Sequence, residues 1–319
     1  MSGTAARVTT VVPTYRRPAL LSRALASVAM QTYRDLVVRV YDNASGDGTE
    51  SVVRDFAARD PRFHYFAHAE NIGAERNFRF GLEHVDTEYF SFLSDDDLLL
   101  PRFYEAAVAA LDEHSDALMA ATGVVHASPG GGFALEPSLE PGMHRPPEGL
   151  DGMLRLNQPC WTGALFRREI LEQVGTIDEA TVIDLDLELR LAAHHPFVVL
   201  AEPGGVLTTG NHFGKCLHWS KPFAAIIDKL TRDEGLTGAQ KELARTSLQR
   251  RLHTMVYQTG IVATRMGKQD VAGEAARVLE RDFGDAAGAR KVRALALLAP
   301  LAPAARWVRR AARPAGRSH

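Results

Sequence analysis

The chain has 319 residues, of which 45% are hydrophobic and 24% charged, a balance that excludes a disordered chain and a fibrous repeat. The net charge is −2, but residues 290–319 hold eight Lys and Arg and no acidic residue. Residues 1–289 therefore carry 29 basic and 39 acidic residues, a net charge of −10. An acidic body with a basic tail argues against nucleic-acid binding, which places its basic patch on the fold itself.

The composition also bears on where the protein works. The longest weakly polar stretch, residues 294–305, is too short to cross a bilayer and contains two prolines, so we expect no transmembrane helix. Residues 1–10 hold one charged side chain and no long apolar run, so we expect no secretory signal. Cys160 and Cys216 cannot form a disulfide framework, which favours a cytoplasmic location. The Arg-rich and Ala-rich composition is typical of GC-rich bacterial coding.

The first 120 residues alternate short apolar runs with stretches in which apolar residues recur at helical spacing. We predict strands at Val8–Val12, Leu36–Tyr41, Phe63–Phe66 and Tyr89–Leu93. We predict helices at Pro18–Gln31, Glu50–Arg59, Ala74–His84 and Pro101–His114. This alternation indicates βαβ units and a mainly parallel α/β sheet, which binds ligands at the carboxyl ends of its strands.

The second half of the chain is less regular. Residues 128–149 contain five prolines and five glycines, which predicts a loop that is either a lid or a plain insertion. Beyond it we predict a strand at Thr162–Arg167 and helices at Arg168–Val174, Asp184–His194 and throughout most of Pro222–Gly284. The apolar spacing of the last region permits packing on the rest of the chain or formation of a homodimer.

Polar residues follow three of the predicted strands, at the point where each strand ends. They are residues 14–17 after the first strand, 42–45 after the second and 94–97 after the fourth. Because parallel strands end at one edge of a sheet, we expect the three clusters to lie together. The three consecutive aspartates of the last cluster repel one another beside an apolar strand unless a cation lies among them. The run therefore favours a Mg²⁺ site, the alternative being a solvated acidic helix cap.

The polar clusters and their flanks resemble the opening of family 2 glycosyltransferases of the GT-A fold. The resemblance lies in residues 8–21, 26–33, 41–49, 70–77 and 92–98. In the second half, residues 163–169, 172–175, 177–179 and 183–192 are similar to the acceptor-side segment and catalytic helix of that family. The resemblance implies an inverting transfer of a sugar from a nucleotide-diphosphate sugar, assisted by Mg²⁺ or Mn²⁺.

The resemblance also implies a domain plan. It covers about residues 8–215 and implies a GT-A domain at 1–220, in which 1–120 hold the nucleotide sugar and 121–220 face the acceptor. A helical C-terminal region at 221–289 and a basic tail at 290–319 follow. The tail permits a peripheral contact with an anionic membrane at its inner face, the alternative being a solvated C-terminus.

The family's donor-binding residues correspond here to Pro13, Thr14, Tyr15, Arg17, Asp42, Asn43, Arg76 and Asp95. Tyr15 can stack on a base. Asn43 stands where the usual pattern has a second aspartate, and an amide both donates and accepts hydrogen bonds. The departure leaves both uridine and deoxythymidine open as the base.

The resemblance places the metal at Asp96 and Asp97, with His212 where many members have a histidine that reaches the metal or the diphosphate. Ser94 replaces the first aspartate of many members. The implied general base is Asp184 at the start of its helix. Asp186 is the rival, because the glutamate that often precedes the base is missing here.

Trp161 and Thr162 correspond to acceptor contacts of the family, although Trp161 is equally typical of a core residue. The sequence assigns neither the sugar nor the acceptor, which can carry a hydroxyl or an amine. One alternative function is a nucleotidyltransferase, disfavoured because Pro13–Pro18 is not glycine-rich. A dinucleotide-dependent oxidoreductase is disfavoured for the same reason. Another alternative is a non-catalytic relative that binds nucleotide sugars, disfavoured by the intact carboxylates.

Overall fold

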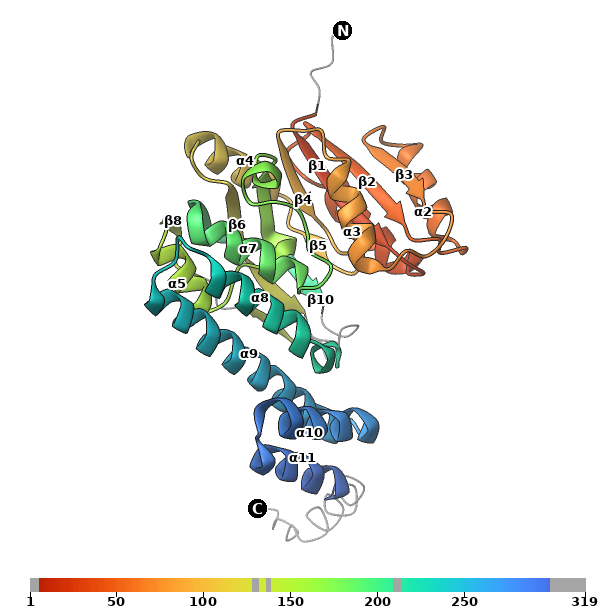
Figure 1. The fold of residues 1–319 in the computed structure, drawn as a ribbon. Coiled ribbons are helices and arrows are strands. Elements are labelled where there is room, and N and C mark those ends of the chain that lie inside the picture. The colour runs from red at the N-terminus through yellow and green to blue at the C-terminus, as the bar shows by residue number, and fades with distance from the viewer. Residues whose placement is uncertain (1–5, 128–131, 136–138, 209–213, 299–319) are drawn as a thin grey trace, which may run out of the picture. The chain divides into compact units, whose positions relative to one another are not determined.

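The computed structural model describes residues 6–127, 132–135, 139–208 and 214–298 (Figure 1). The chain forms two compact units, one of Met1–Gly210 with Asp228–Ala244 and the other of Asn211–Ile227 with Arg245–His319. The domain boundaries expected at residues 220 and 289 stay a prediction. Within the described residues, no helix combines the length and the apolarity that crossing a membrane requires.

The first unit is built on one sheet of ten described strands, in the order β3-β2-β1-β4-β9-β6-β10-β5, with β7 beside β6 and β8 beside β10. The strands are β1 Val8–Thr14, β2 Leu36–Asp42, β3 Phe63–Ala67, β4 Tyr89–Phe92, β5 Leu98–Leu99, β6 Met119–Ala127, β7 Phe133–Leu135, β8 Gly142–His144, β9 Ala164–Arg167 and β10 Phe197–Thr208. Strands β3, β2, β1 and β4 are parallel, as predicted. The α/β fold class is thus confirmed.

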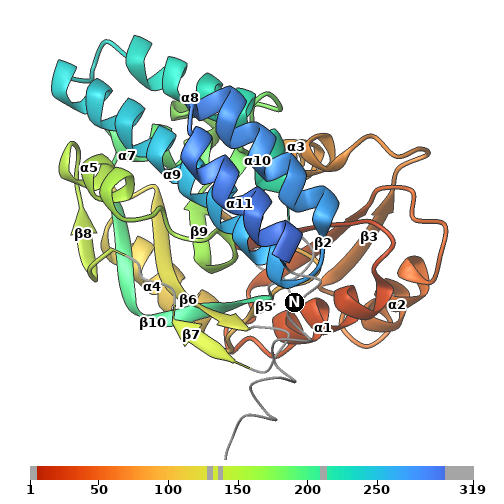
Figure 2. The ribbon, with the colours of Figure 1, turned by 90° about the horizontal axis from the view of Figure 1, so that it is seen from below.

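Helices cover both faces of this sheet. They are α1 Pro18–Ala29, α2 Thr49–Ala57, α3 Ala74–Glu83, α4 Phe103–Glu113, α5 Glu148–Arg155, α6 Ile170–Gln173 and α7 Ile183–His194. Helices α1, α2 and α4 share a buried apolar cluster with β1 and β2, whereas α3 lies on the opposite face (Figure 2). A Cβ at Gly81 of α3 would come within 2.4 Å of Val11, so glycine allows this helix to approach β1 closely.

The helical C-terminal region is confirmed. It comprises α8 Ser220–Arg232, α9 Gly238–Arg265, α10 Gln269–Phe283 and the unpredicted α11 Ala286–Leu298. Within the second unit, Gly260 of α9 faces Ala275 of α10 and Val292 of α11, both of them fully buried. The basic tail lies mostly beyond the described residues, so its membrane contact stays a prediction, as does a homodimer.

The second half of the sheet differs from the prediction. Strands β6 and β10 were not predicted, and β9 pairs antiparallel with both β4 and β6, so this half is mixed and not parallel. Strand β6 is rich in alanine and contains a glycine, residues with low β-propensity, so its sequence does not predict a strand. Strand β10 is interrupted by Pro203 and two glycines, and its register against β6 shifts between Leu200 and Gly205. Strands β7 and β8 lie inside residues 128–149, which were predicted to form a loop.

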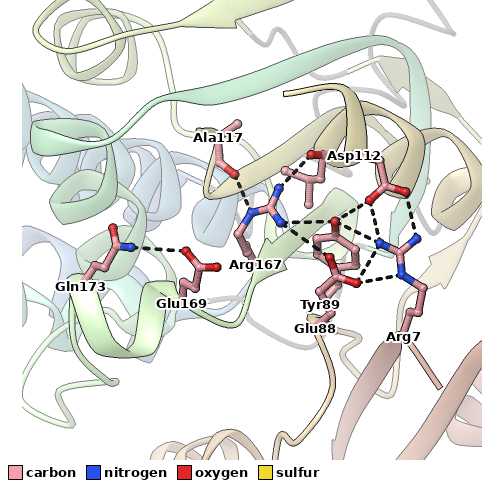
Figure 3. Close-up of polar contacts among 9 residues, drawn as sticks. Arg7, Glu88, Tyr89, Asp112, Ala117, Arg167, Glu169 and Gln173 are labelled. Atoms are coloured by element: carbon pink, nitrogen blue, oxygen red, sulfur yellow. Dashed lines mark hydrogen bonds and ion pairs between the residues drawn. The ribbon is translucent and has the colours of Figure 1, made fainter. Parts of the chain in front are cut away.

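An ion-pair cluster at the amino end of β1 joins residues of β4, α4 and β9 (Figure 3). Arg7 donates to Glu88 at 2.8 Å and to both carboxylate oxygens of Asp112 at 2.9 and 2.7 Å. Tyr89 donates to Asp112 at 2.7 Å, and Arg167 of β9 donates to the Leu111 carbonyl at 2.8 Å. The hydrogen bonds from Arg7 hold the pKa of Asp112 down, to about 2. The cluster stabilises the sheet at the end of β1 and β4 that lies opposite the predicted polar clusters.

This lowered pKa predicts a pH-dependent stability. Because the folded pKa of Asp112 lies below the ordinary value of 3.8, its stabilisation is complete above that value and is lost as the pH falls toward 2. Asp112 is 43% exposed, so solvent screening limits the expected loss in Asp112→Asn to about 1 kcal/mol at pH 7. Thermal unfolding at pH 7 and pH 3 should show a difference from wild type that shrinks at the lower pH. The exposed Asp55→Asn is the control, and an equal difference at both pH values would contradict the account.

Candidate active site

Two loops at the carboxyl ends of β1 and β2 contact each other. Thr14 and Asp42 are paired in the parallel register of these strands. Arg16 and Ala44 adopt positive φ angles of 55° and 59°, which non-glycine residues rarely do. The Arg16 backbone N–H donates to the Ser45 hydroxyl at 2.8 Å. Two strained loops held against each other are typical of a functional site.

Asp42 organises the second loop. Its Oδ1 accepts hydrogen bonds from the backbone N–H of Ser45 at 3.0 Å and from the Ser45 hydroxyl. Its Oδ2 accepts a hydrogen bond from the Tyr65 hydroxyl at 2.7 Å, and the residue is only 3% exposed. Burial and this carboxylate together raise the pKa of Tyr65 above its usual range. The Tyr65 hydroxyl therefore stays protonated and keeps Asp42 in one orientation.

Asn43 joins this loop to the segment before α3. Its Oδ1 accepts a hydrogen bond from the Ile72 N–H at 2.8 Å, and its Nδ2 donates to Asn71 Oδ1 at 3.0 Å. The segment leads into the first turn of α3, which carries Arg76. The Arg76 side chain is 66% exposed and pairs with Glu179 at 3.1 Å.

The predicted aspartate run follows β4 and is buried, since all three residues are 5% exposed or less. Asp95 accepts a hydrogen bond from the Thr14 hydroxyl at 2.8 Å. One guanidinium nitrogen of Arg17 lies 3.1 Å from Asp95 Oδ1 and 3.2 Å from Asp96 Oδ2. Burial raises the pKa of Asp95, against the opposing effects of Thr14 and Arg17. The structure thus brings the first and third polar clusters together, as expected for parallel strands that end at one edge of a sheet.

Asp97 points to other partners. Its Oδ2 accepts a hydrogen bond from the Thr162 hydroxyl at 2.6 Å, and its Oδ1 accepts one from the Thr208 N–H at 3.0 Å. The Thr208 hydroxyl also donates to the Asp96 carbonyl. Asp97 therefore links the aspartate run to the short helix Trp161–Gly163 before β9 and to the end of β10.

The chemistry of a divalent cation fits Asp95 and Asp96 best. Two buried carboxylates that already share one positive charge are the oxygen donors that Mg²⁺ and Mn²⁺ prefer. Among the residues that the structure describes, no set of three or more His, Cys, Asp and Glu side chains is arranged to hold a metal. The predicted ligand His212 lies outside the described residues, and the metal role of Asp97 stays a prediction.

The two candidate bases on α7 lie in different surroundings. Asp184 is the second residue of the helix and is half-buried. Asp186 is 1% exposed and pairs with Arg190 and Lys229, each at 3.0 Å. Asp186 is therefore held between two cations, Arg190 of its own helix and Lys229.

The two predicted acceptor contacts also differ. Thr162 reaches the aspartate run through its hydroxyl, as described above. Trp161 is 9% exposed and packs on Phe92 and Phe78, with ring centroids 3.9 and 5.3 Å away. Its Nε1 is buried and has no hydrogen-bond partner among the described residues. Pro13 is buried at the end of β1, whereas the neighbouring Tyr15 is 36% exposed.

Sequence reasoning missed several residues around the site. Thr208 ends β10, and the rule that functional residues follow strand ends would have found it had that strand been predicted. Tyr65, Arg190 and Lys229 act through contacts between distant segments, for which the sequence carries no local signal.

A comparison with known protein families decides the identity. The model of glycosyl transferase family 2 matches residues 9–175, which is more than half of the chain. The chain belongs to glycosyl transferase family 2. The predicted resemblance is confirmed, and the aspartate run falls within the matched segment.

Curated relatives match this chain over limited lengths. It is 37% identical over 95 residues to the GalNAc(5)-diNAcBac-PP-undecaprenol beta-1,3-glucosyltransferase of Campylobacter jejuni, covering 30% of this chain and 31% of that protein. It is 29% identical over 106 residues to an uncharacterized glycosyltransferase of Rickettsia typhi, covering 33% of this chain and 32% of that protein. The chain thus spans about a third of the length of these curated relatives.

Solved structures share the fold over nearly the whole chain. S. aureus TarS 1-349 aligns with a TM-score of 0.65 and 17% identity, covering 94% of this chain and 87% of that chain. A mannosyltransferase from Pyrobaculum calidifontis, solved with GDP-Man and Mn²⁺, aligns with a TM-score of 0.55 and 20% identity, covering 92% and 86%. At these identities the likeness establishes the fold of this family 2 member.

The shared guanidinium of Arg17 generates a prediction. Arg17→Met leaves Asp95 and Asp96 buried without their common cation, which should cost roughly 1–2 kcal/mol because Arg17 itself is partly exposed. Mn²⁺ should then raise the melting temperature of Arg17→Met more than that of wild type, because the metal replaces the lost charge. Thermal shift with and without Mn²⁺ measures this.

Arg23→Met removes an exposed arginine from α1 and is the matched control for this measurement. An equal Mn²⁺ shift in wild type and Arg17→Met would contradict a cation site between the two carboxylates.

Proposed function

We propose that this chain is an inverting glycosyltransferase that moves a sugar from a UDP- or dTDP-sugar to a hydroxyl or amine acceptor. The observation that carries the proposal is the pair of buried carboxylates, Asp95 and Asp96, at the carboxyl end of β4. Both carboxylates pair with the guanidinium of Arg17, in the loop after β1. This is the edge of the sheet at which open α/β folds bind nucleotides. The process served is glycan or specialised-metabolite biosynthesis in a bacterial cytoplasm.

The donor lies, in this proposal, across the loops after β1 and β2. Tyr15 is exposed and offers a ring face to the base, while the Arg16 guanidinium lies 5.0 Å from its ring centroid. Asp42 and Asn43 read the base edge, with Pro13 and Thr14 shaping the pocket floor. Arg17 and Arg76 face the diphosphate, and both are at least 32% exposed, so a ligand can reach them.

A divalent cation, Mg²⁺ or Mn²⁺, is held by Asp96 with Asp95, and Asp97 and His212 are the further proposed ligands. When bound, the cation neutralises charge on the departing diphosphate. Of the chain's own groups, Arg17 is the side chain that must turn from the carboxylates toward the diphosphate. Asp95 then keeps the hydrogen bond from Thr14, which fixes its orientation.

Asp184 is the proposed general base. It accepts the proton from the acceptor hydroxyl or amine as that atom attacks the anomeric carbon from the face opposite the leaving diphosphate. A base placed in this way contributes about 10²–10⁴-fold to the rate. We favour Asp184 over Asp186 because Asp186 already accepts hydrogen bonds from two cations in the interior. Trp161 and Thr162 are the proposed acceptor-side residues.

The fold relatives support a nucleotide-sugar donor. TarS 1-349 has been solved in complex with UDP-GlcNAc, at a TM-score of 0.65 and 15% identity to this chain. The glucosyltransferase of Campylobacter jejuni is named for a lipid-linked glycan acceptor. A non-catalytic relative that binds nucleotide sugars is the alternative, and it predicts donor binding without transfer. The loop after β1 lacks the glycines of a nucleotidyltransferase.

A donor panel tests the proposal. UDP, dTDP, GDP and CDP are titrated by calorimetry, each with Mn²⁺, Mg²⁺ or EDTA. We expect one uridine or thymidine diphosphate to bind with metal and to lose at least tenfold in affinity in EDTA, because Asp95 and Asp96 would hold a cation that offsets the charge of the phosphates. Asp96→Asn should reproduce the EDTA result with metal present. Binding of none of the four, or binding that EDTA leaves unchanged, would contradict the proposal.

A further inference from the structure

A partly buried ion-pair network lies beside the first turn of α7 and is not used by the chemistry described above. Asp186 is 1% exposed, and its Oδ2 accepts a hydrogen bond from Arg190 Nε at 3.0 Å. Lys229 Nζ, from α8, donates to both oxygens of Asp186 at 3.1 and 3.0 Å. Lys229 also lies 2.7 Å from Asp178 Oδ2, so two carboxylates face two cations and the network is electrically balanced.

The same side chains fix the segment that leads into α7. Arg190 donates to the carbonyl oxygens of Val174 and, at 3.1 Å, of Thr176. Asp178 accepts the Ala180 N–H at 2.9 Å, and the hydrogen bond from Lys229 holds the pKa of Asp178 below its usual range. Residues 174–180 are therefore tied both to α7 and to α8 immediately before the helix begins.

We propose that Lys229 is a positioning residue for Asp184. By binding Asp186 and Asp178 together, it fixes the first turn of α7 and the segment before it, and so sets the direction of the Asp184 carboxylate. This inference rests on the proposed function, in which Asp184 is the base. Lys229 lies well beyond residues 9–175, the segment that the family model matches, so membership of the family does not supply this residue.

Solvent can reach this network from one side. The Lys229 side chain is 31% exposed and lines a pocket of about 350 Å³ together with Arg190, Leu230, Arg232, Asp228 and Asp233. A small alkylammonium ion is far smaller than this pocket. Truncating Lys229 to alanine therefore leaves room for an added amine to restore the missing cation beside Asp186.

The loss of Lys229 should act on turnover and not on donor affinity. In Lys229→Ala, Asp186 keeps Arg190 but loses Lys229, and with it the hydrogen bonds that join the start of α7 to α8. Residues that orient a functional group from behind typically change activity by about 10–100-fold, and we expect kcat to fall in that range. Among the described residues, Lys229 pairs with Asp178 and Asp186 and not with the donor loops after β1 and β2. The dissociation constant of the donor should therefore stay within about twofold.

The experiment measures release of the nucleoside diphosphate from the donor that the panel identifies. Lys229→Ala is compared with wild type, with the conservative Lys229→Arg, and with Lys221→Ala, which removes an exposed lysine earlier in the same helix. We expect Lys221→Ala to match wild type and Lys229→Arg to keep most of its kcat. Ethylammonium should raise the kcat of Lys229→Ala at least fivefold while leaving wild type unchanged.

Two results would overturn the proposal. One is a wild-type kcat in Lys229→Ala, and the other is a low kcat that ethylammonium does not raise although the variant is folded and binds donor. If Lys229→Ala does not fold, Lys229→Met keeps the aliphatic stem and must show the same loss of kcat at unchanged donor affinity.

Asp184→Asn separates this inference from the proposed function. If Asp184→Asn turns over like wild type, the base assignment fails. If it loses about 10²-fold or more while Lys229→Ala does not, the base assignment stands and the positioning role of Lys229 is wrong.

Discussion

The candidate active site depends on two carboxylates buried side by side at the end of β4. Asp95 and Asp96 are 5% and 3% exposed, and two negative charges in such surroundings require a compensating positive charge. The protein supplies it from the loop after β1, where Arg17 reaches both carboxylates. That contact is possible only because β1 and β4 are parallel neighbours whose carboxyl ends lie at one edge of the sheet. The need of the two carboxylates for a positive charge thus makes the candidate site depend on the pairing of β1 with β4.

Another buried aspartate, Asp186, meets the same physical requirement in a different way. Its two cations come from its own helix and from α8, and both also hold backbone or side chains of the segment before α7. Arg17, by contrast, pairs with Asp95 and Asp96 and belongs to a strained loop. The Arg17 pair suits a site in which a bound metal ion replaces the guanidinium. The Asp186 network, with its several further contacts, suits a fixed support for α7. This contrast is why we assign cation binding to Asp95 and Asp96, and a positioning role to Lys229 beside Asp186.

The sequence predicted the first half of the fold well, because apolar periodicity and turn residues agree there. The same strand ends correctly placed Thr14, Arg17 and Asp95 together, since parallel strands bring their carboxyl ends to one edge. Strands β6 and β10 could not be predicted, because small residues and a Pro-Gly-Gly interruption weaken their pattern. Their absence from the prediction also hid Thr208 and the antiparallel pairs of β9.

Tertiary contacts were the other limit of the sequence analysis. Three consecutive aspartates look equivalent in the sequence, yet two share Arg17 and the third binds Thr162 and Thr208. Likewise, the spacing of Asp184 and Asp186 gave no reason to expect that Lys229, more than forty residues later, would bind Asp186. Such choices depend on which distant segment packs nearby, and a local pattern does not contain that information.

The most direct test of the central claim is electron paramagnetic resonance of Mn²⁺ titrated into the protein with the diphosphate that binds. The account predicts that wild type and the exposed-site control Asp55→Asn bind one Mn²⁺ per protein in the presence of the nucleotide. In Asp96→Asn the Mn²⁺ should give only the signals of the free ion and of its complex with the nucleotide. Mn²⁺ binding by Asp96→Asn equal to that of wild type would contradict a cation site at the end of β4.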